Sequence, residues 1–253
     1  MKHPRLIARR ELLAAGLASA GGLLLSGCSR PTPPTYGNLL RLGDNLTYTA
    51  HRLLLPGQSL VKEYSHGDIS SFPAVGTTDP AQPAYGRPPS ETYRELRRRG
   101  FADFRLTLEG LVARPGTWSL VDLKALTSRT QITRHVCEEG WSAIGEWTGV
   151  PLSRLLDAAG LQPAARFVTF HSIDGVVDSI DLLDALHPQT LLAYGMNGRD
   201  LPVPHGAPLR LRVERQVGYK SMKFVTRIAV TEHLDDGGDQ GNPKNGWAWY
   251  AGV

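Results

Sequence analysis

Cys137 is the residue whose type and surroundings first suggest chemistry. It follows the β-branched and apolar run from Thr130 to Val136 and precedes Glu138-Glu139-Gly140-Trp141. The chain has two cysteines, and the other, Cys28, lies in a leader-like segment, so we expect Cys137 to have no intramolecular disulfide partner. An unpaired thiol in this position is typical of a nucleophile or of a ligand for a soft metal, but a lone cysteine is also often just a small buried hydrophobic residue.

Residues 1–27 have the features of an export signal. A basic start precedes an alanine- and glycine-rich apolar stretch from Leu12 to Leu25, which is too short to span a bilayer comfortably. Its end, Leu25-Ser26-Gly27-Cys28, resembles the lipobox of bacterial lipoproteins. Arg9-Arg10 resembles a twin-arginine signal for proteins exported already folded, and an ordinary secretory signal is the alternative. We therefore expect a protein on the periplasmic or cell-envelope side, anchored to the membrane by a lipid on Cys28.

The leader also carries most of the excess positive charge. The whole chain has 28 basic and 24 acidic residues, a net charge of +4. Residues 1–27 hold four of the basic and one of the acidic residues, which leaves 24 against 23 and a net charge of +1. The basic pI is therefore no sign of a nucleic acid partner. The sequence also has no Gly-rich strand-to-helix turn of the nucleotide-binding kind.

Composition divides the rest of the chain into three parts. Residues 28–60 are expected to form a Pro-rich tether and an N-terminal extension, and residues 61–233 to form one folded domain. Within that domain, residues 67–89 are rich in Pro, Gly, Ser and Thr, which predicts a long ordered loop or disorder. A loop of this length is usually functional. Residues 234–253 are expected to form a C-terminal tail whose two tryptophans could dock back.

Hydrophobic periodicity predicts strands interleaved with short helices. The expected strands cover residues 104–109, 130–137, 167–171, 190–194, 209–214 and 224–230. The expected helices follow the N-cap Ser119, start at Pro151 and end at Gly160, and cover residues 180–186. Asn197-Gly198 predicts a type I′ hairpin. These elements predict a single α+β domain with mixed β-sheets and short helices.

Two strands place polar residues in informative positions. On the strand that ends at Cys137, Gln131, Thr133 and His135 share its face. On the strand over 209–214, Arg210, Arg212 and Glu214 alternate with apolar residues. That alternation is typical of a half-buried strand with a solvated polar face.

Several blocks of sequence resemble the molybdopterin-binding domain of the sulfite oxidase superfamily. The block around the cysteine reads His135-Val136-Cys137-Glu138-Glu139-Gly140-Trp141-Ser142. The blocks cover, in the order seen in the family, residues 132–142, 147–152, 191–198, 205–210 and 218–223. Several blocks in order are far more specific than one short motif. The resemblance implies a sulfite oxidase-type fold and an oxidoreductase that transfers an oxygen atom and two electrons at molybdenum.

The resemblance also implies roles for individual residues. Cys137 matches the thiolate that ligates molybdenum beside the dithiolene of molybdopterin, with one cofactor per chain and no haem. Tyr194 matches the active-site tyrosine of sulfite-oxidising members, and a strand tyrosine packed at a sheet edge is the alternative. Arg134, three residues before the cysteine, is expected to be a cation that helps to place the substrate.

Further residues are expected to hold the cofactor. His205 and Arg210 match positions that contact the pterin and its phosphate, although an arginine on an alternating strand is commonly only solvated. Ser221, Met222 and Lys223 match a loop that wraps the pterin, where backbone N–H groups and an ammonium can hold an anion.

Two assignments are weaker. Ser172 falls where methionine sulfoxide reductases of this superfamily use a threonine toward the cofactor. Ser70 lies in the loop over 67–78, where relatives contribute further pterin contacts.

The substrate is expected to be a small sulfur-containing molecule. Tyr194 favours oxidation of sulfite or a related oxyanion, whereas the short, exported layout favours the alternative, a methionine sulfoxide reductase. A lipid-anchored binding or structural protein that keeps the fold without metal is the non-enzyme alternative. The sequence has no Cys-x-x-Cys-His haem motif. Electrons are therefore expected to come from or go to a separate protein, either a c-type cytochrome or a membrane haem subunit.

Overall fold

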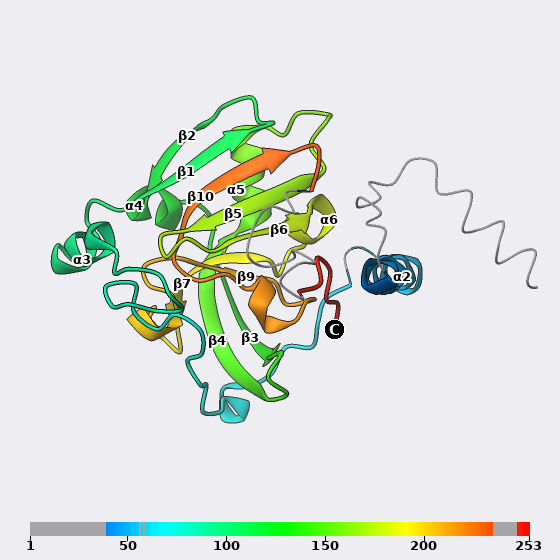
Figure 1. Ribbon diagram of the computed structural model, residues 1–253, viewed down its shortest axis with the longest axis horizontal. Helices are drawn as coiled ribbons and strands as arrows, with labels where there is room; N and C mark the ends of the chain where they lie inside the picture. The colour runs from blue at the N-terminus through cyan, green and yellow to red at the C-terminus, as the bar shows by residue number, and fades with distance from the viewer. Residues whose placement is uncertain (1–38, 56, 58, 235–246) are drawn as a thin grey trace, which may run out of the picture. The chain divides into compact units, whose positions relative to one another are not determined.

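The computed structural model describes residues 39–55, 57, 59–234 and 247–253 (Figure 1). The expected export signal, the lipidation site Cys28 and the Pro-rich start of the tether lie outside the described residues. So does much of the expected C-terminal tail. Among the residues described, no helix has both the length and the apolarity needed to cross a membrane.

Two five-stranded sheets form the framework of the fold (Figure 1). The first sheet has, in spatial order, β2 (Gly116–Ser119), β1 (Arg105–Gly110), β10 (Val225–Thr231), β5 (Phe167–Ser172) and β6 (Val177–Asp181). The pair β1 and β10 is parallel, and the other pairs in this sheet are antiparallel. The sheet is therefore mixed, as the sequence predicts.

The second sheet carries the candidate metal-binding cysteine at the end of one of its strands. Its order is β3 (Arg129–Val136), β4 (Ser142–Pro151), β7 (Leu191–Met196) and β8 (Arg199–Asp200), and β9 (Arg210–Arg212) also pairs with β7. All of these pairs are antiparallel. Asn197 and Gly198 connect β7 to β8 with φ angles of 50° and 72°, which confirms the predicted hairpin turn.

Short helices connect and cover the strands. They are α2 (Leu39–Leu54), α3 (Glu91–Arg98), α4 (Leu120–Ala125), α5 (Leu152–Ala159) and α6 (Leu182–Ala185), with 3₁₀ turns η1 (His66–Asp68), η2 (Val203–His205) and η3 (Gly218–Lys220). Ser119 and Asp122 form the expected capping box of α4. Gly160 ends α5 with a φ of 74°, a conformation that favours glycine.

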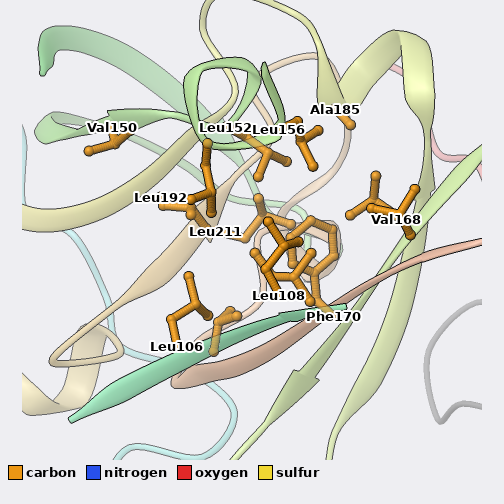
Figure 2. Close-up of a cluster of buried hydrophobic side chains, with 14 of the residues drawn as sticks. Leu106, Leu108, Val150, Leu152, Leu156, Val168, Phe170, Ala185, Leu192 and Leu211 are labelled. Atoms are coloured by element: carbon orange, nitrogen blue, oxygen red, sulfur yellow. The ribbon is translucent and has the colours of Figure 1, made fainter. Parts of the chain in front are cut away.

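One hydrophobic core joins both sheets to α5 (Figure 2). Leu106 and Leu108 from β1 meet Leu152 and Leu156 from α5, and all four are fully buried. Phe170 from β5 lies in the same cluster (Figure 2). Each such side chain contributes about 1.5–3 kcal/mol by leaving water, so this core fixes the sheet that carries Cys137.

Most of the predicted elements are confirmed, and the main exceptions are helical. The predicted helix over 180–186 is wrong at its start, because Ile180 and Asp181 end strand β6 and only residues 182–185 are helical. Gly175, with a φ of 88°, turns the chain so that β6 pairs with β5. Helices α2 and α3 were not predicted.

Helix α2 docks onto the fold together with the end of the chain. Arg52 of α2 donates two hydrogen bonds to the Asp181 carboxylate, at 2.9 and 2.8 Å, and lies 3.0 Å from Asp184. Tyr48 packs against Trp249, which is 1% exposed. Trp247 packs against Tyr219, with ring centroids 4.9 Å apart, so both tail tryptophans lie on the fold.

Candidate active site

A cavity of about 530 Å³ opens beside Cys137. Its walls come from the loop over 72–77, the turn after β3, the β5–β6 turn and the segment from η2 to Lys223. Six of the residues predicted from the sequence line it together: Cys137, His205, Arg210, Ser221, Met222 and Lys223. The long loop that the sequence marks as functional supplies one whole wall.

The Cys137 thiol is presented by a tight turn at the end of β3. The Cys137 N–H donates to the Trp141 carbonyl at 2.9 Å, and the Gly140 N–H donates to the Cys137 carbonyl at 3.1 Å. Gly140 has a φ of 88°, which explains the glycine in the Glu-Glu-Gly-Trp sequence. The turn leaves Cys137 4% exposed, with its Sγ 3.5 Å from Oε2 of Glu138.

The surroundings of Cys137 disfavour a free thiolate. Burial, together with the Glu138 and Glu139 carboxylates, raises the pKa of the thiol to about 11. A thiol that keeps its proton at neutral pH is a weak nucleophile. A bound metal cation would reverse this balance, because a coordinating thiol loses its proton.

Arg210 forms the cationic wall of the cavity. It is 4% exposed, and its guanidinium donates to the backbone carbonyls of His205 at 2.9 Å and Ser221 at 2.8 Å. It makes no salt bridge with any carboxylate in the described part of the chain. Burial, and then the nearby Arg212, lowers its pKa. The Glu214 carboxylate offsets this only in part, so the Arg210 charge lacks a directly paired anion among the described residues.

Lys223 is a second buried cation whose hydrogen bonds go to backbone carbonyls. Its ammonium donates to the carbonyls of Val75, Thr77 and Pro204. Burial, and then Arg210, lowers its pKa to about 7. Lys223 thus ties the loop over 72–77 to η2 and turns a partly uncompensated charge toward the cavity.

His135 is a cavity residue to which the sequence gave no role. It is 7% exposed, and its ring lies 5.1 Å from Phe72 and 5.7 Å from Trp141, between ring centroids. Nδ1 of His135 lies 2.7 Å from a guanidinium nitrogen of Arg212. Burial, and then Arg212, lowers the pKa of His135 to about 2, so the imidazole is neutral. The sequence did contain a signal for His135, because it alternates onto the same face of the expected strand as Cys137.

Comparisons with known proteins place these features in a family. A profile described as "Oxidoreductase molybdopterin binding domain" matches residues 94–238. The chain belongs to this family. The sulfite oxidase superfamily fold implied by the sequence is thereby confirmed, and so is a molybdopterin-dependent oxidoreductase as the general class.

The chain is also similar in sequence to individual known proteins. The chain is 33% identical to the "Putative protein-methionine-sulfoxide reductase subunit YedZ1" of Azospira oryzae, over 99% of this chain and 90% of that protein. It is 31% identical to the "Protein-methionine-sulfoxide reductase catalytic subunit MsrP" of Pseudomonas syringae pv. tomato, over 58% of this chain and 49% of that protein. The chain thus matches about half the length of that second relative.

A solved structure shares the fold. The sulfane dehydrogenase SoxCD from Paracoccus pantotrophus matches 53% of this chain and 40% of its own chain, with a TM-score of 0.51 and 25% identity.

The cavity fits a molybdopterin cofactor. Arg210 and Lys223 supply positive charge that suits a phosphate, and the Cys137 thiol would be a suitable ligand for a soft metal. In the described residues, no cluster of three or more His, Cys, Asp or Glu could hold a metal. A single protein thiolate therefore suits a metal whose other ligands come from the cofactor.

Ser221 and Met222 of the predicted pterin loop have different surroundings. Oγ of Ser221 accepts a hydrogen bond from the Val213 N–H at 3.1 Å, so its role is to shape the loop. Met222 is 4% exposed and belongs to the core as well as to the cavity wall.

Two predicted catalytic residues of this molybdopterin domain do not line the cavity. Tyr194 is the extra residue of a β-bulge in β7, because Thr148 pairs with Gly195 and Gly149 with Ala193. A bulge re-aims side chains, and the Tyr194 hydroxyl lies 2.6 Å from Oγ of Ser128. Arg134 is exposed on the other face of β3 from His135.

The two weaker predictions also lie outside the cavity wall. Oγ of Ser70 accepts the N–H of Ile144 at 3.0 Å, which pins the start of the long loop to β4. Ser172 is buried at the end of β5, next to the turn that contributes Asp174 to the cavity. Both residues thus support cavity walls without contributing to their surface.

Proposed function

We propose that this protein is an exported molybdenum enzyme that reduces methionine sulfoxide in peptides or proteins. The balanced reaction takes the sulfoxide, two electrons and two protons to the thioether and water. The observation that carries the proposal is the charge around Cys137: the charged side chains that act on its thiol are the Glu138 and Glu139 carboxylates, and no cation is among them.

The charge around Cys137 discriminates between the two substrate classes. Sulfite is an anion, and two unit charges 4 Å apart interact by about 1 kcal/mol in water and about 4 kcal/mol near a protein surface. Glu138 and Glu139 would therefore repel sulfite at the metal. A sulfoxide is uncharged, so it avoids this penalty.

The aromatic lining of the cavity also suits a methionine side chain. Phe72, Tyr85, Trp141 and Trp247 line the cavity. Aromatic rings make favourable contacts with sulfur and with methyl groups. An open cavity bordered by aromatic residues can accept a methionine sulfoxide that remains part of a peptide.

The chain's own residues divide the work of binding. When bound, the molybdenum cofactor supplies the two-electron redox chemistry. Cys137 would ligate the metal, Arg210 and Lys223 would hold the phosphate, and His205 would contact the pterin. Phe72 and Trp141 would exclude water from the metal end of the cavity.

Relatives support the choice of substrate and the need for a partner. The curated relatives are named as protein-methionine-sulfoxide reductases, and their names describe them as a subunit or a catalytic subunit. We propose that electrons reach this chain from a separate protein, either a membrane haem subunit or a c-type cytochrome.

Sulfite oxidation is the second candidate. The sequence favoured it through Tyr194, whose side chain lies at the Ser128 hydroxyl instead of at the cavity. It therefore ranks below sulfoxide reduction.

Paired assays test the substrate. Protein exported by its own signal is given methionine sulfoxide with a reduced viologen, and sulfite with ferricyanide. We expect turnover with the sulfoxide and little with sulfite. The double variant Glu138→Gln/Glu139→Gln should gain sulfite turnover, while an exposed control, Glu95→Gln, should not. Faster turnover of sulfite than of sulfoxide by the natural protein would overturn the proposal.

We also propose that export ends with a lipid on Cys28 and that α2 then lies against the bilayer surface. Leu42, Leu46 and Leu53 are 53%, 51% and 72% exposed, and their spacing places them on one face of α2, away from Arg52. Mass spectrometry of the mature N-terminus tests the anchor. An acylated Cys28 supports it, and an unmodified N-terminus contradicts it.

A further inference from the structure

His135 has one ring nitrogen that the fold uses and one that it leaves open. Nδ1 lies 2.7 Å from Nη1 of Arg212, and Nε2 makes no hydrogen bond with any described residue. The imidazole lines the cavity although the residue is only 7% exposed. A ring nitrogen that lines a cavity and has no protein partner can form its hydrogen bond with a ligand or with water.

The contact with Arg212 fixes which nitrogen carries the hydrogen. A guanidinium can only donate, so Nδ1 must accept, and the hydrogen of the neutral ring is on Nε2. Nε2 of His135 is therefore a hydrogen-bond donor, held in one tautomer by its neighbour.

A buried network holds Arg212 in turn. Its guanidinium forms two hydrogen bonds to the Glu214 carboxylate, at 3.1 and 2.7 Å. It also stacks on the fully buried ring of Trp147, 4.4 Å from the centroid. Gln131 donates to the same carboxylate at 3.1 Å. Four groups thus set the orientation of one imidazole, a degree of support that is typical of a functional position.

The imidazole lines the same cavity as the Cys137 thiol. His135 is the penultimate residue of β3 and Cys137 directly follows the strand, so their Cα atoms lie about 7 Å apart. Gly218 makes room for the ring, because a Cβ there would lie 2.4 Å from Nε2. Phe72 and Trp141 flank the imidazole and keep it from swinging away.

We infer that His135 binds the cofactor by donating its Nε2 hydrogen to an acceptor atom near the metal end, and that Arg212 is its positioning residue. This inference rests on the proposed cofactor site but not on the identity of the substrate. With this contact, β3 and the turn after it would provide a hydrogen bond to the cofactor in addition to the Cys137 thiolate.

Matched variants test the contact without any substrate. His135→Leu removes the donor at similar size, and His135→Gln keeps an amide N–H at similar reach. Loss of a buried hydrogen bond of about 1–1.5 kcal/mol corresponds to roughly a tenfold change. We expect the leucine variant to release pterin and molybdenum about tenfold faster than the natural protein, and the glutamine variant to stay within about threefold. Equal release from both variants, or no change in the leucine variant, would overturn the inference.

A second measurement covers the case in which a variant fails to fold. In natural protein labelled with ¹⁵N-histidine, pulsed EPR of the Mo(V) state should detect a histidine nitrogen and an exchangeable proton near the metal. The signal should persist in His233→Gln, which alters an exposed histidine. Absence of any histidine coupling in the natural protein would contradict the contact. Failure of sulfoxide turnover with this coupling intact would count only against the proposed substrate.

Discussion

Two buried cationic regions of this protein differ in how their charge is balanced. Arg52 lies against Asp181 and Asp184, and although burial alone would lower its pKa, these carboxylates raise it. Arg210 is as deeply buried, but only backbone carbonyls accept its hydrogen bonds among the described residues. The Arg52 ion pairs attach α2 to the rest of the fold. Arg210 has no directly paired carboxylate among the described residues.

This difference identifies the binding site more directly than residue types do. A buried charge is costly unless it is paired. Proteins that retain an unpaired one at a cavity wall commonly use it for a ligand. Lys223 repeats the pattern of Arg210 from another segment, so the two cations together mark the end of the cavity where a phosphate would bind.

Substitution of Arg52 is expected to have the largest effect on stability. Arg52→Met leaves Asp181 and Asp184 buried without their partner, and breaking such a pair costs about 3–5 kcal/mol. Denaturant unfolding of the cofactor-free protein measures this loss. Arg98→Met, at an exposed pair with Glu95, should change the free energy of unfolding by less than about 1 kcal/mol. Similar losses of unfolding free energy in the two variants would contradict the structural role assigned to the buried Arg52 pair.

Substitution of Arg210 should weaken cofactor binding and spare the fold. Arg210→Met removes a buried charge that has no carboxylate partner, so the cofactor-free protein should unfold at an equal or higher denaturant concentration. Hydrogen bonds to charged groups contribute about 1.5–3 kcal/mol, so cofactor affinity should fall by about 10- to 150-fold. Pterin content after dialysis measures this. Destabilisation of the cofactor-free protein as large as that of Arg52→Met would show that Arg210 serves the fold.

The pH dependence of stability tests whether the Lys223 ammonium is desolvated. Burial lowers the pKa of Lys223 to about 7 in the folded protein, against about 10.4 for an unfolded lysine. Between these values the unfolded state binds more protons, so the stability of the cofactor-free protein gains from rising pH, by at most about 1.4 kcal/mol per unit.

The matched variant isolates this contribution. In Lys223→Met the rise between about pH 7 and pH 10 should be shallower, as measured by denaturant unfolding at several pH values. Identical pH profiles for the two proteins would mean that the ammonium is not desolvated. Bound cofactor should also flatten the profile of the natural protein, because its anion would stabilise the charged lysine.

Local sequence signals predicted the framework because they act over a few residues. Phe104, Leu106 and Leu108 alternate and are all buried, and Ser119 caps its helix through Asp122 as expected. The turn that presents Cys137 depends on Gly140, which the sequence shows directly. Features of this kind depend only on residues that are near one another in the sequence.

The rest depends on contacts between distant segments. Arg210 and Arg212 occupy the side of β9 that alternation marks as solvated, yet both are buried because Trp147 stacks against them. The sequence resemblance implies an active-site role for Tyr194, but a bulge opposite Gly149 re-aims its side chain. Helix α3 has a charged sequence with little apolar periodicity, and its buried anchor, Tyr93, bonds to the distant Ala207 carbonyl. Sequence periodicity carries no information about these partners.

The central claim is that Cys137 holds molybdenum in a cavity whose unpaired cations bind the cofactor phosphate. Elemental and pterin analysis of protein exported by its own signal from a molybdate-fed host tests it most directly. We expect about one molybdenum and one pterin per chain in the natural protein, and no retained molybdenum in a folded Cys137→Ser variant. A natural protein without molybdenum, or a serine variant that keeps it, would contradict the account.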